Sequence, residues 1–366
     1  MKGKGAGRHA AEEAARSMLP GIRFTQAAPD VGDTPLLQYL ADFWKDGSPY
    51  VRECTQVRKK PLSARYLRGH RDDTRLHIEP FPGFQGIILR QLTPGLIRDW
   101  MTWAAEKGLK GGRINKVMEA MRGAVKYAFQ REEISRDPFR NIGKAPDTRK
   151  EKGVLTPVEL AALIRAPVTD PRGRLAVLLG ALCGLRLGEV RGLLWGDIGD
   201  GIITVRHNFI DEDGLKAPKC GSTGLVPFTE SVGAAIEEVH RVSVNPGPER
   251  YVMESLKCPG KPCGKGYFEQ ALQRELETIG IPGKRRPHLG KKSPEGYVDE
   301  QRRRNLTFHG LRHTFVTLGR LAGISDLEIQ ALARHKSGAM MERYSHAGQV
   351  LDFAAAREKL EKAINT

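Results

Sequence analysis

The stretch Leu306–Thr317, LTFHGLRHTFVT, predicts the start of an apolar helix that carries a histidine and an arginine three residues apart. Residues at this spacing lie on the same face of a helix, so we expect the side chains of His309 and Arg312 to lie side by side. An arginine can bind phosphate oxygens through two parallel hydrogen bonds, and a histidine can exchange a proton near neutral pH. Each side chain alone is more often structural than functional, so the rest of the chain has to decide.

Three further segments in the C-terminal half carry side chains of related chemistry. Arg186 lies at the junction between an apolar segment that ends at Gly184 and the helix that follows. Lys219 lies at the turn of a hairpin that we predict over residues 215–228. The segments are GLRLGEV at 184–190, PK at 218–219, and ALARH at 331–335, which is followed by ERYSH at 342–346 and so adds His335 and Tyr344.

The order and spacing of these residues resemble those of the tyrosine recombinase (phage integrase) family, whose members share an R…K…HxxR…H/W…Y constellation. GLRLGEV resembles the family's first arginine box, LTFHGLRHTFVT its HxxR box, and HKSGAMMERYSH (335–346) its final segment from histidine to tyrosine. The resemblance is strong over about residues 150–350 and looser over residues 34–145. It implies a site-specific DNA recombinase, an integrase that integrates or excises a mobile element. The catalytic residues that it implies are Arg186, Lys219, His309, Arg312, His335 and Tyr344.

The chemistry of strand cleavage gives each of these residues a role. Arg186 and Arg312 would hold the non-bridging phosphate oxygens and stabilise the charge of the transition state, as a metal ion does in other enzymes. Tyr344 would attack the phosphorus to give a 3′-phosphotyrosine, which stores the bond energy for religation, so no ATP, metal ion or other cofactor is expected. The remaining roles are general acid for Lys219, acceptance of the tyrosine proton for His309, and a hydrogen bond to the phosphate for His335.

Two positions depart from the family pattern. The family usually has glycine directly before the second histidine, whereas this chain has Arg334. The predicted hairpin lacks the basic residues often found after the lysine, which leaves Lys216 as an alternative to Lys219 for the general acid. Glu189 has two open interpretations, because it either orients Arg186 or is a surface residue of its helix.

The composition favours a polyanionic partner. Lys and Arg number 59 against 43 Asp and Glu, a formal net charge of +16, and phosphates that such residues neutralise release counterions and drive binding. The charge therefore favours nucleic acid, and the resemblance implies that the partner is double-stranded DNA at a specific recombination site. No segment is apolar for long enough to span a bilayer, and Met1–Arg16 lacks the apolar run of a signal peptide, so we expect a cytoplasmic protein that acts on DNA without a membrane partner. Five scattered cysteines are too few for a disulfide scaffold.

The length of 366 residues allows two domains, and the pattern predicts a mostly α fold with a small β-sheet. The resemblance implies that the two domains form a DNA clamp. The domains that we predict are a tail or small appended DNA-binding element at 1–33, a helical core-binding (DNA-binding) domain at 34–147, and a tyrosine-recombinase catalytic domain at 148–366.

Capping signals predict where several helices begin and end. Helices are expected to begin at Thr34-Pro35, at Thr93-Pro94, and at the capping box Thr156–Glu159. The Pro/Gly-rich basic stretch 280–304 has little apolar content and is predicted to be a loop or insertion.

Recombination cuts two duplexes on two strands each, so we expect a homotetramer in the synaptic complex. The amphipathic segment Leu351–Ile364 is expected to dock on a neighbouring protomer, and packing against its own domain is the alternative.

Four alternatives compete with this interpretation. His309 and His313 have the spacing of a zinc-binding helix, but Gly310 stands where the HExxH motif needs glutamate. Cys258 and Cys263 are candidates for half of a zinc site whose second ligand pair is not evident. A type IB topoisomerase shares the chemistry, but the separate helical domain favours a recombinase. A DNA-binding relative without catalysis is disfavoured by the completeness of the constellation.

Overall fold

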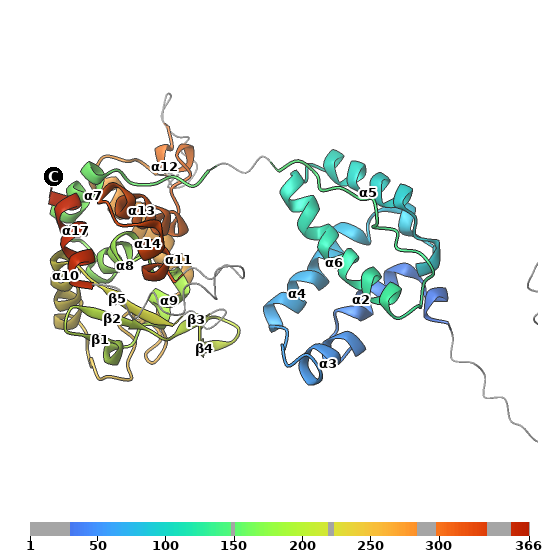
Figure 1. Cartoon of the computed structure of the whole chain (residues 1–366), viewed down its shortest axis with the longest axis horizontal. Coiled ribbons are helices and arrows are strands. Elements are labelled where there is room, and N and C mark those ends of the chain that lie inside the picture. Colours follow the sequence, from blue (N-terminus) through green and yellow to red (C-terminus); the bar gives the residue numbers. More distant parts are fainter. Residues whose placement is uncertain (1–29, 148–150, 219–222, 284–297, 335–352, 366) are drawn as a thin grey trace, which may run out of the picture. The chain divides into compact units, whose positions relative to one another are not determined.

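The computed structural model describes residues 30–147, 151–218, 223–283, 298–334 and 353–365. The chain divides into two compact units, Met1–Arg149 and Lys150–Thr366 (Figure 1). Helices dominate both units, and the strands of the second unit form two small antiparallel sheets, so the prediction of a mostly α fold with a small β element is confirmed. Among the described residues, no helix combines the length and the hydropathy needed to cross a membrane.

The first unit is a set of helices around one hydrophobic core. Its largest fully buried side chains include those of Trp44, Phe84 and Trp100. Its α-helices are α2 (Leu36–Phe43), α3 (Pro49–Gln56), α4 (Ala64–Asp73), α5 (Pro94–Glu106) and α6 (Gly111–Gln130).

Capping explains the ends of α5. The Thr93 hydroxyl accepts a hydrogen bond from the backbone N–H of Leu96 at 3.2 Å, which confirms the helix start predicted there. Gly108, with a φ of 86°, takes the left-handed conformation that ends the helix. The helix start predicted at Thr34-Pro35 was one residue early. Thr34 is the C-terminal cap of a short 3-10 helix, and α2 begins only at Leu36.

The second unit is larger and contains both sheets. Its helices are α7 (Pro157–Arg165), α8 (Pro171–Leu182), α9 (Leu187–Gly192), α10 (Glu230–Arg241), α11 (Lys265–Thr278), α12 (Glu300–Arg303), α13 (Phe308–Leu321), α14 (Asp326–Leu332) and α17 (Phe353–Asn365). Its strands are β1 (Ile198–Gly199), β2 (Ile202–Val205), β3 (Asn208–Ile210), β4 (Gly214–Lys216) and β5 (Gly224–Pro227). The capping box predicted before α7 is confirmed, because the side chains of Thr156 and Glu159 each bond the other residue's backbone N–H.

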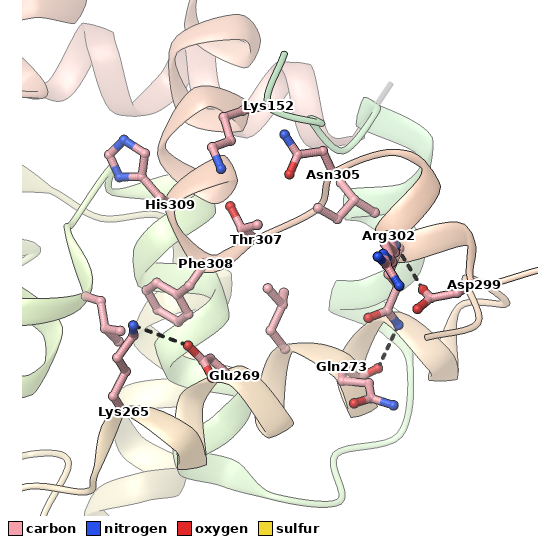
Figure 2. A pocket seen from close by; sticks show the side chains of 14 residues that line it. Lys152, Lys265, Glu269, Gln273, Asp299, Arg302, Asn305, Thr307, Phe308 and His309 are labelled. Atoms are coloured by element: carbon pink, nitrogen blue, oxygen red, sulfur yellow. Dashed lines mark hydrogen bonds and ion pairs between the residues drawn. The ribbon is translucent and has the colours of Figure 1, made fainter. Parts of the chain in front are cut away.

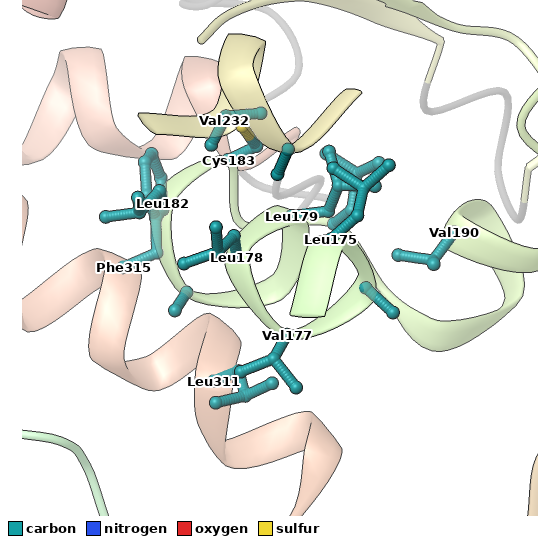
Figure 3. Packing of buried hydrophobic residues seen from close by; sticks show 14 of the residues in the cluster. Leu175, Val177, Leu178, Leu179, Leu182, Cys183, Val190, Val232, Leu311 and Phe315 are labelled. Atoms are coloured by element: carbon teal, nitrogen blue, oxygen red, sulfur yellow. The ribbon is translucent and has the colours of Figure 1, made fainter. Parts of the chain in front are cut away.

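Helix α8 is the centre of the second core. It is buried from Gly173 to Leu182 and packs against α10, α11 and α13, which explains why this stretch is apolar on all sides except for Arg174, which pairs with the buried Glu275 of α11. Figure 3 shows Leu311 and Phe315 of α13 beside α8. A Cβ at Gly180 would lie only 2.9 Å from the Leu311 side chain, so the two helices approach as closely as glycine allows.

The sheets correct one prediction. In the three-stranded sheet β5 pairs antiparallel with β2, with Ile203 opposite Val226, whereas β4 pairs with β3 in a separate hairpin. Residues 215–228 therefore do not form one hairpin, because the two strand-like ends that we predicted have different partners.

The structure corrects two further expectations about the second unit. The basic stretch 280–304 is not loop throughout, since Glu300–Arg303 form α12, while residues 284–297 lie outside the described residues. Helix α17 packs against α7, α13 and β5 of its own unit, and it buries Leu360 and Ile364 there. In the structure, α17 therefore follows the alternative and packs against its own domain, because its apolar face is covered by elements of the same chain.

Candidate active site

Arg186 and Glu189 form the first part of the site, at the start of α9. The Arg186 backbone N–H donates to Glu189 Oε2 at 2.9 Å, and its Nη1 donates to Glu189 Oε1 at 2.7 Å. The Glu189 side chain is only 1% exposed, whereas that of Arg186 is 36% exposed. Glu189 is therefore not a surface residue, and it orients an arginine whose guanidinium remains accessible to a ligand.

Arg312 lies on the first turns of α13 and is buried. The Thr307 hydroxyl caps this helix by accepting a hydrogen bond from the Gly310 N–H at 3.2 Å. Arg312 Nη1 donates to the carbonyl oxygen of Gly184 at 2.5 Å, and Nη2 donates to that of Ala333. Through these two hydrogen bonds, Arg312 connects the HxxR helix α13 to the arginine box and to the end of α14.

Arg334 completes a cluster that the sequence did not reveal. Its Nη2 donates to Glu189 Oε2 at 2.8 Å, so Glu189 contacts Arg186 and Arg334 at once. The cluster then contains three guanidiniums and one carboxylate. Burial, followed by the positive charges of Arg186 and Arg334, lowers the pKa of Arg312 to about 9. An anion bound here would relieve this repulsion, so the cluster suits a phosphate group.

His309 lies one helical turn before Arg312, and burial is the main cause that lowers its pKa. His313, followed by Arg312, Lys152 and Arg186, acts in the same direction. The lowered pKa favours the neutral imidazole, which is the form that can accept a proton. Figure 2 shows His309 with Lys152 and Thr307 beside a cavity of about 560 Å³. Lys265 also lines this cavity and lies 3.5 Å from Glu269.

Comparison with known proteins decides what kind of site this is. The sequence model described as the phage integrase family matches residues 153–349, which include every segment of the cluster. The chain belongs to the phage integrase family. It is a tyrosine recombinase, an enzyme that transfers DNA strands, as the resemblance of its motifs predicts.

Relatives and solved structures agree with this assignment. The integrase of Mycobacterium phage L5 is 26% identical over 296 residues, which cover 77% of this chain and 71% of that protein. The integrase of Mycobacterium phage FRAT1 is 25% identical over 318 residues, which cover 83% and 87%. The recombinase shares its fold with the Tn1549 transposon integrase in complex with circular intermediate DNA, at a TM-score of 0.61, 19% identity, and coverage of 89% of this chain and 99% of that one. A lambda integrase tetramer bound to a Holliday junction matches at a TM-score of 0.58 and 16% identity, with coverage of 92% and 88%.

Three predicted site residues of the recombinase, Lys219, His335 and Tyr344, lie outside the described residues. The alternative lysine is described: Lys216 Nζ lies 2.7 Å from the Asp213 carboxylate within the β3–β4 hairpin. This hairpin is attached to α9 by Arg191, whose Nη2 donates to Asp211 at 2.5 Å and whose guanidinium lies 4.9 Å from the centre of the Phe209 ring.

The residues considered for zinc are also described. The rings of His309 and His313 lie 5.4 Å apart, while Cys258 is exposed and Cys263 is buried. In the part of the chain that the structure describes, these residues belong to no group of three or more potential metal ligands.

Sequence reasoning missed two residues near the site. Lys152 lies near the start of the predicted catalytic domain and had no predicted role, yet its charge helps to lower the pKa of His309. The only sequence signal for Arg334 was its departure from the family's usual glycine.

Proposed function

We propose that this recombinase cleaves and rejoins DNA through a 3′-phosphotyrosine on Tyr344 and that it integrates or excises a mobile element. The observation that carries the proposal is the cluster of Arg186, Arg312, Arg334 and Glu189, in which positive charges outnumber negative ones. His309, whose pKa is lowered, lies one helical turn from Arg312. Such a cluster supports the binding of a phosphodiester whose charge increases in the transition state.

The cleavage step conserves atoms and protons without a further reactant. The Tyr344 oxygen forms a bond to phosphorus, and the bond between phosphorus and the 5′ oxygen breaks. His309 takes the tyrosine proton, Lys219 supplies a proton to the departing 5′ oxygen, and His335 donates a hydrogen bond to the phosphate. For Lys219, His335 and Tyr344 these roles rest on the resemblance of their motifs to the family. Religation is the reverse sequence with a new 5′ hydroxyl.

The substrate that we propose is duplex DNA at a specific site, held by the helical first unit as well as by the catalytic unit. The net charge of +16 supports this partner. We also propose that four copies assemble on two sites, since the fold is shared with the lambda integrase that was solved as a tetramer bound to a Holliday junction.

Mapping of covalently trapped DNA ends tests this function. The chain is incubated with DNA of its source element, the reaction is stopped with detergent, and the DNA ends attached to protein are sequenced. We expect the ends to concentrate at one short sequence with the protein on the 3′ side. Ends spread evenly over the DNA would instead indicate relaxation of the topoisomerase kind.

A further inference from the structure

Arg334 has a backbone conformation that disfavours its side chain. Its φ is 53°, in the left-handed region where glycine is at ease and other L-residues are strained. The family usually has glycine at this position, directly before the second histidine. The arginine therefore needs compensating contacts to be stable here.

The contacts of Arg334 are buried and specific. Nη1 donates to the Leu332 carbonyl oxygen at 2.9 Å, and Nη2 donates to Glu189 Oε2 at 2.8 Å. The side chains of Arg334 and Glu189 are 3% and 1% exposed. The aliphatic part packs on β5, because a Cβ at Gly224 would lie 3.2 Å from Arg334 Cδ. Arg334 thus links the end of α14, the first residue of β5 and the arginine box.

The electrostatic consequence concerns Glu189. Without Arg334, the Glu189 carboxylate would pair with Arg186 alone, since Oε1 and Oε2 both accept hydrogen bonds from that residue. Burial by itself would raise the pKa of Glu189. The charge of Arg334, the strongest opposing influence, helped by contacts with Arg186, brings the pKa below its usual range. One negative charge is therefore divided between two guanidiniums, and the cluster keeps two positive charges in excess.

We propose that Arg334 is a positioning residue that shares Glu189 with Arg186, and so preserves the excess positive charge that the scissile phosphate needs. Arg334 acts through Glu189 and not by touching DNA. This inference rests on the proposed function, and it adds a residue that occupies the place of the usual glycine. Without Arg334, the Arg186–Glu189 pair is neutral and Arg186 stabilises the transition state less.

The test uses variants of the full-length chain in single-turnover cleavage of a nicked DNA substrate. Arg334→Met keeps an aliphatic stem against Gly224 but removes the charge. We expect the cleavage rate to fall by about tenfold or more, less than the roughly 10²–10³-fold loss typical of a direct donor, while DNA affinity changes little. Arg334→Lys keeps the charge and should recover most of the rate. Arg320→Met is the matched control, since it removes one exposed charge from the far end of α13 and should leave the rate unchanged.

The decisive variant is the double substitution Arg334→Met with Glu189→Gln. It restores two excess positive charges, so we expect it to cleave faster than Arg334→Met alone. A role in packing alone predicts no such rescue, and a double variant no faster than the single one would overturn the proposal. A methylphosphonate at the scissile position, which lacks the phosphate charge, should also shrink the difference between wild type and Arg334→Met. A deficit that stayed as large on this substrate would count equally against the proposal.

Two additions keep the test conclusive. Should Arg334→Met melt below the assay temperature, Arg334→Gly replaces it, because glycine suits the φ of 53° while it too removes the charge. Binding of inorganic phosphate, measured by calorimetry, reports on the cluster without any strand cleavage. Weaker phosphate binding in the variants that lose the charge, Arg334→Met or Arg334→Gly, restored in the double variant, is expected even if the wild type forms no covalent adduct. That result would separate a failure of the proposed function from a failure of this inference. Equal phosphate affinities of the wild type and Arg334→Met would overturn the inference.

Discussion

At the scale of single residues, His309 gives the clearest prediction of pH dependence. Its folded-state pKa is lowered from 6.5 by burial first and by neighbouring positive charges second. As the pH falls, the neutral imidazole therefore still predominates at pH 6.5, and half of the imidazole is protonated only at a lower pH. If it accepts the tyrosine proton, the acid limb of the cleavage rate should have its midpoint below 6.5. A midpoint at or above 6.5 in single-turnover kinetics would contradict this assignment.

The variant His309→Gln provides the control for that measurement. It cannot accept the proton, so the cleavage rate should fall by about 10²-fold or more and the acid limb should disappear. An acid limb that persists unchanged in the variant would belong to another group.

The lysine is a second prediction at this scale. If Lys219 is the general acid, Lys219→Ala should be slow on ordinary DNA, because the 5′ oxygen leaves unprotonated. Sulfur in place of the bridging 5′ oxygen needs no proton, so the variant should cleave that substrate at close to the wild-type rate. Arg186→Ala should remain slow on both substrates, because its defect lies in charge stabilisation.

Lys216→Ala is the matched control for the lysine. Lys216 already pairs with Asp213, and we expect its variant to be nearly normal on both substrates. Sulfur rescue of Lys216→Ala with none of Lys219→Ala would transfer the role to Lys216. No rescue of either would mean that the acid comes from elsewhere in the chain.

At the scale of elements, the link between α8 and α9 sets the position of the arginine box. Gly184 has a φ of 62°, and a Cβ there would lie 2.7 Å from the Phe315 ring. Gly184→Ala should therefore destabilise the second unit by about 1–2 kcal/mol from backbone strain and by roughly 1–3 kcal/mol more from overpacking. It should also slow cleavage, because the Gly184 carbonyl accepts a hydrogen bond from Arg312. Denaturant unfolding measures the first effect.

Gly280→Ala separates the two contributions. Gly280 has a φ of 80° with no atom within 4 Å of an added Cβ, so its variant has the strain without the overpacking. Equal losses of stability in the two variants would show that the contact with Phe315 is unimportant.

The elements also show what could be predicted from sequence and what could not. The starts of α5 and α7 were predictable because Thr93 and Thr156 are local capping signals. The HxxR helix was predictable because its apolar spacing is local as well. The pairing of β5 with β2 was not predictable, because the β3–β4 hairpin lies between these two strands in the sequence. Short strands also carry little information about their partners.

Long-range contacts limited the prediction of the site in the same way. Arg334 pairs with Glu189, which lies 145 positions earlier in the chain, and no spacing rule connects them. The family pattern marked this arginine only as a departure. The buried position of Glu189, which decides between its two interpretations, likewise follows from packing and not from its own helix.

At the scale of the whole molecule, the charge predicts how the protein binds DNA. The net charge of +16 implies contacts with many phosphates, so the logarithm of the affinity should fall linearly and steeply with the logarithm of salt concentration. Cleavage should persist in excess EDTA, because Arg186 and Arg312 supply the positive charge at the phosphate. Filter binding over a salt series and adduct formation in EDTA measure the two effects. Cleavage that is lost in EDTA and restored by zinc or magnesium would contradict the second.

The central claim is that Tyr344 is the nucleophile, and one measurement tests it most directly. Wild type and Tyr344→Phe are incubated with a nicked suicide substrate, and the adducts are resolved on a denaturing gel. We expect the wild type to form a covalent protein–DNA adduct whose DNA-bearing peptide contains Tyr344. The variant lacks only the hydroxyl, so it should bind the DNA with unchanged affinity and form no adduct. An adduct of wild-type yield in Tyr344→Phe, or a DNA-bearing peptide around another tyrosine such as Tyr297 in the basic stretch 280–304, would contradict the claim.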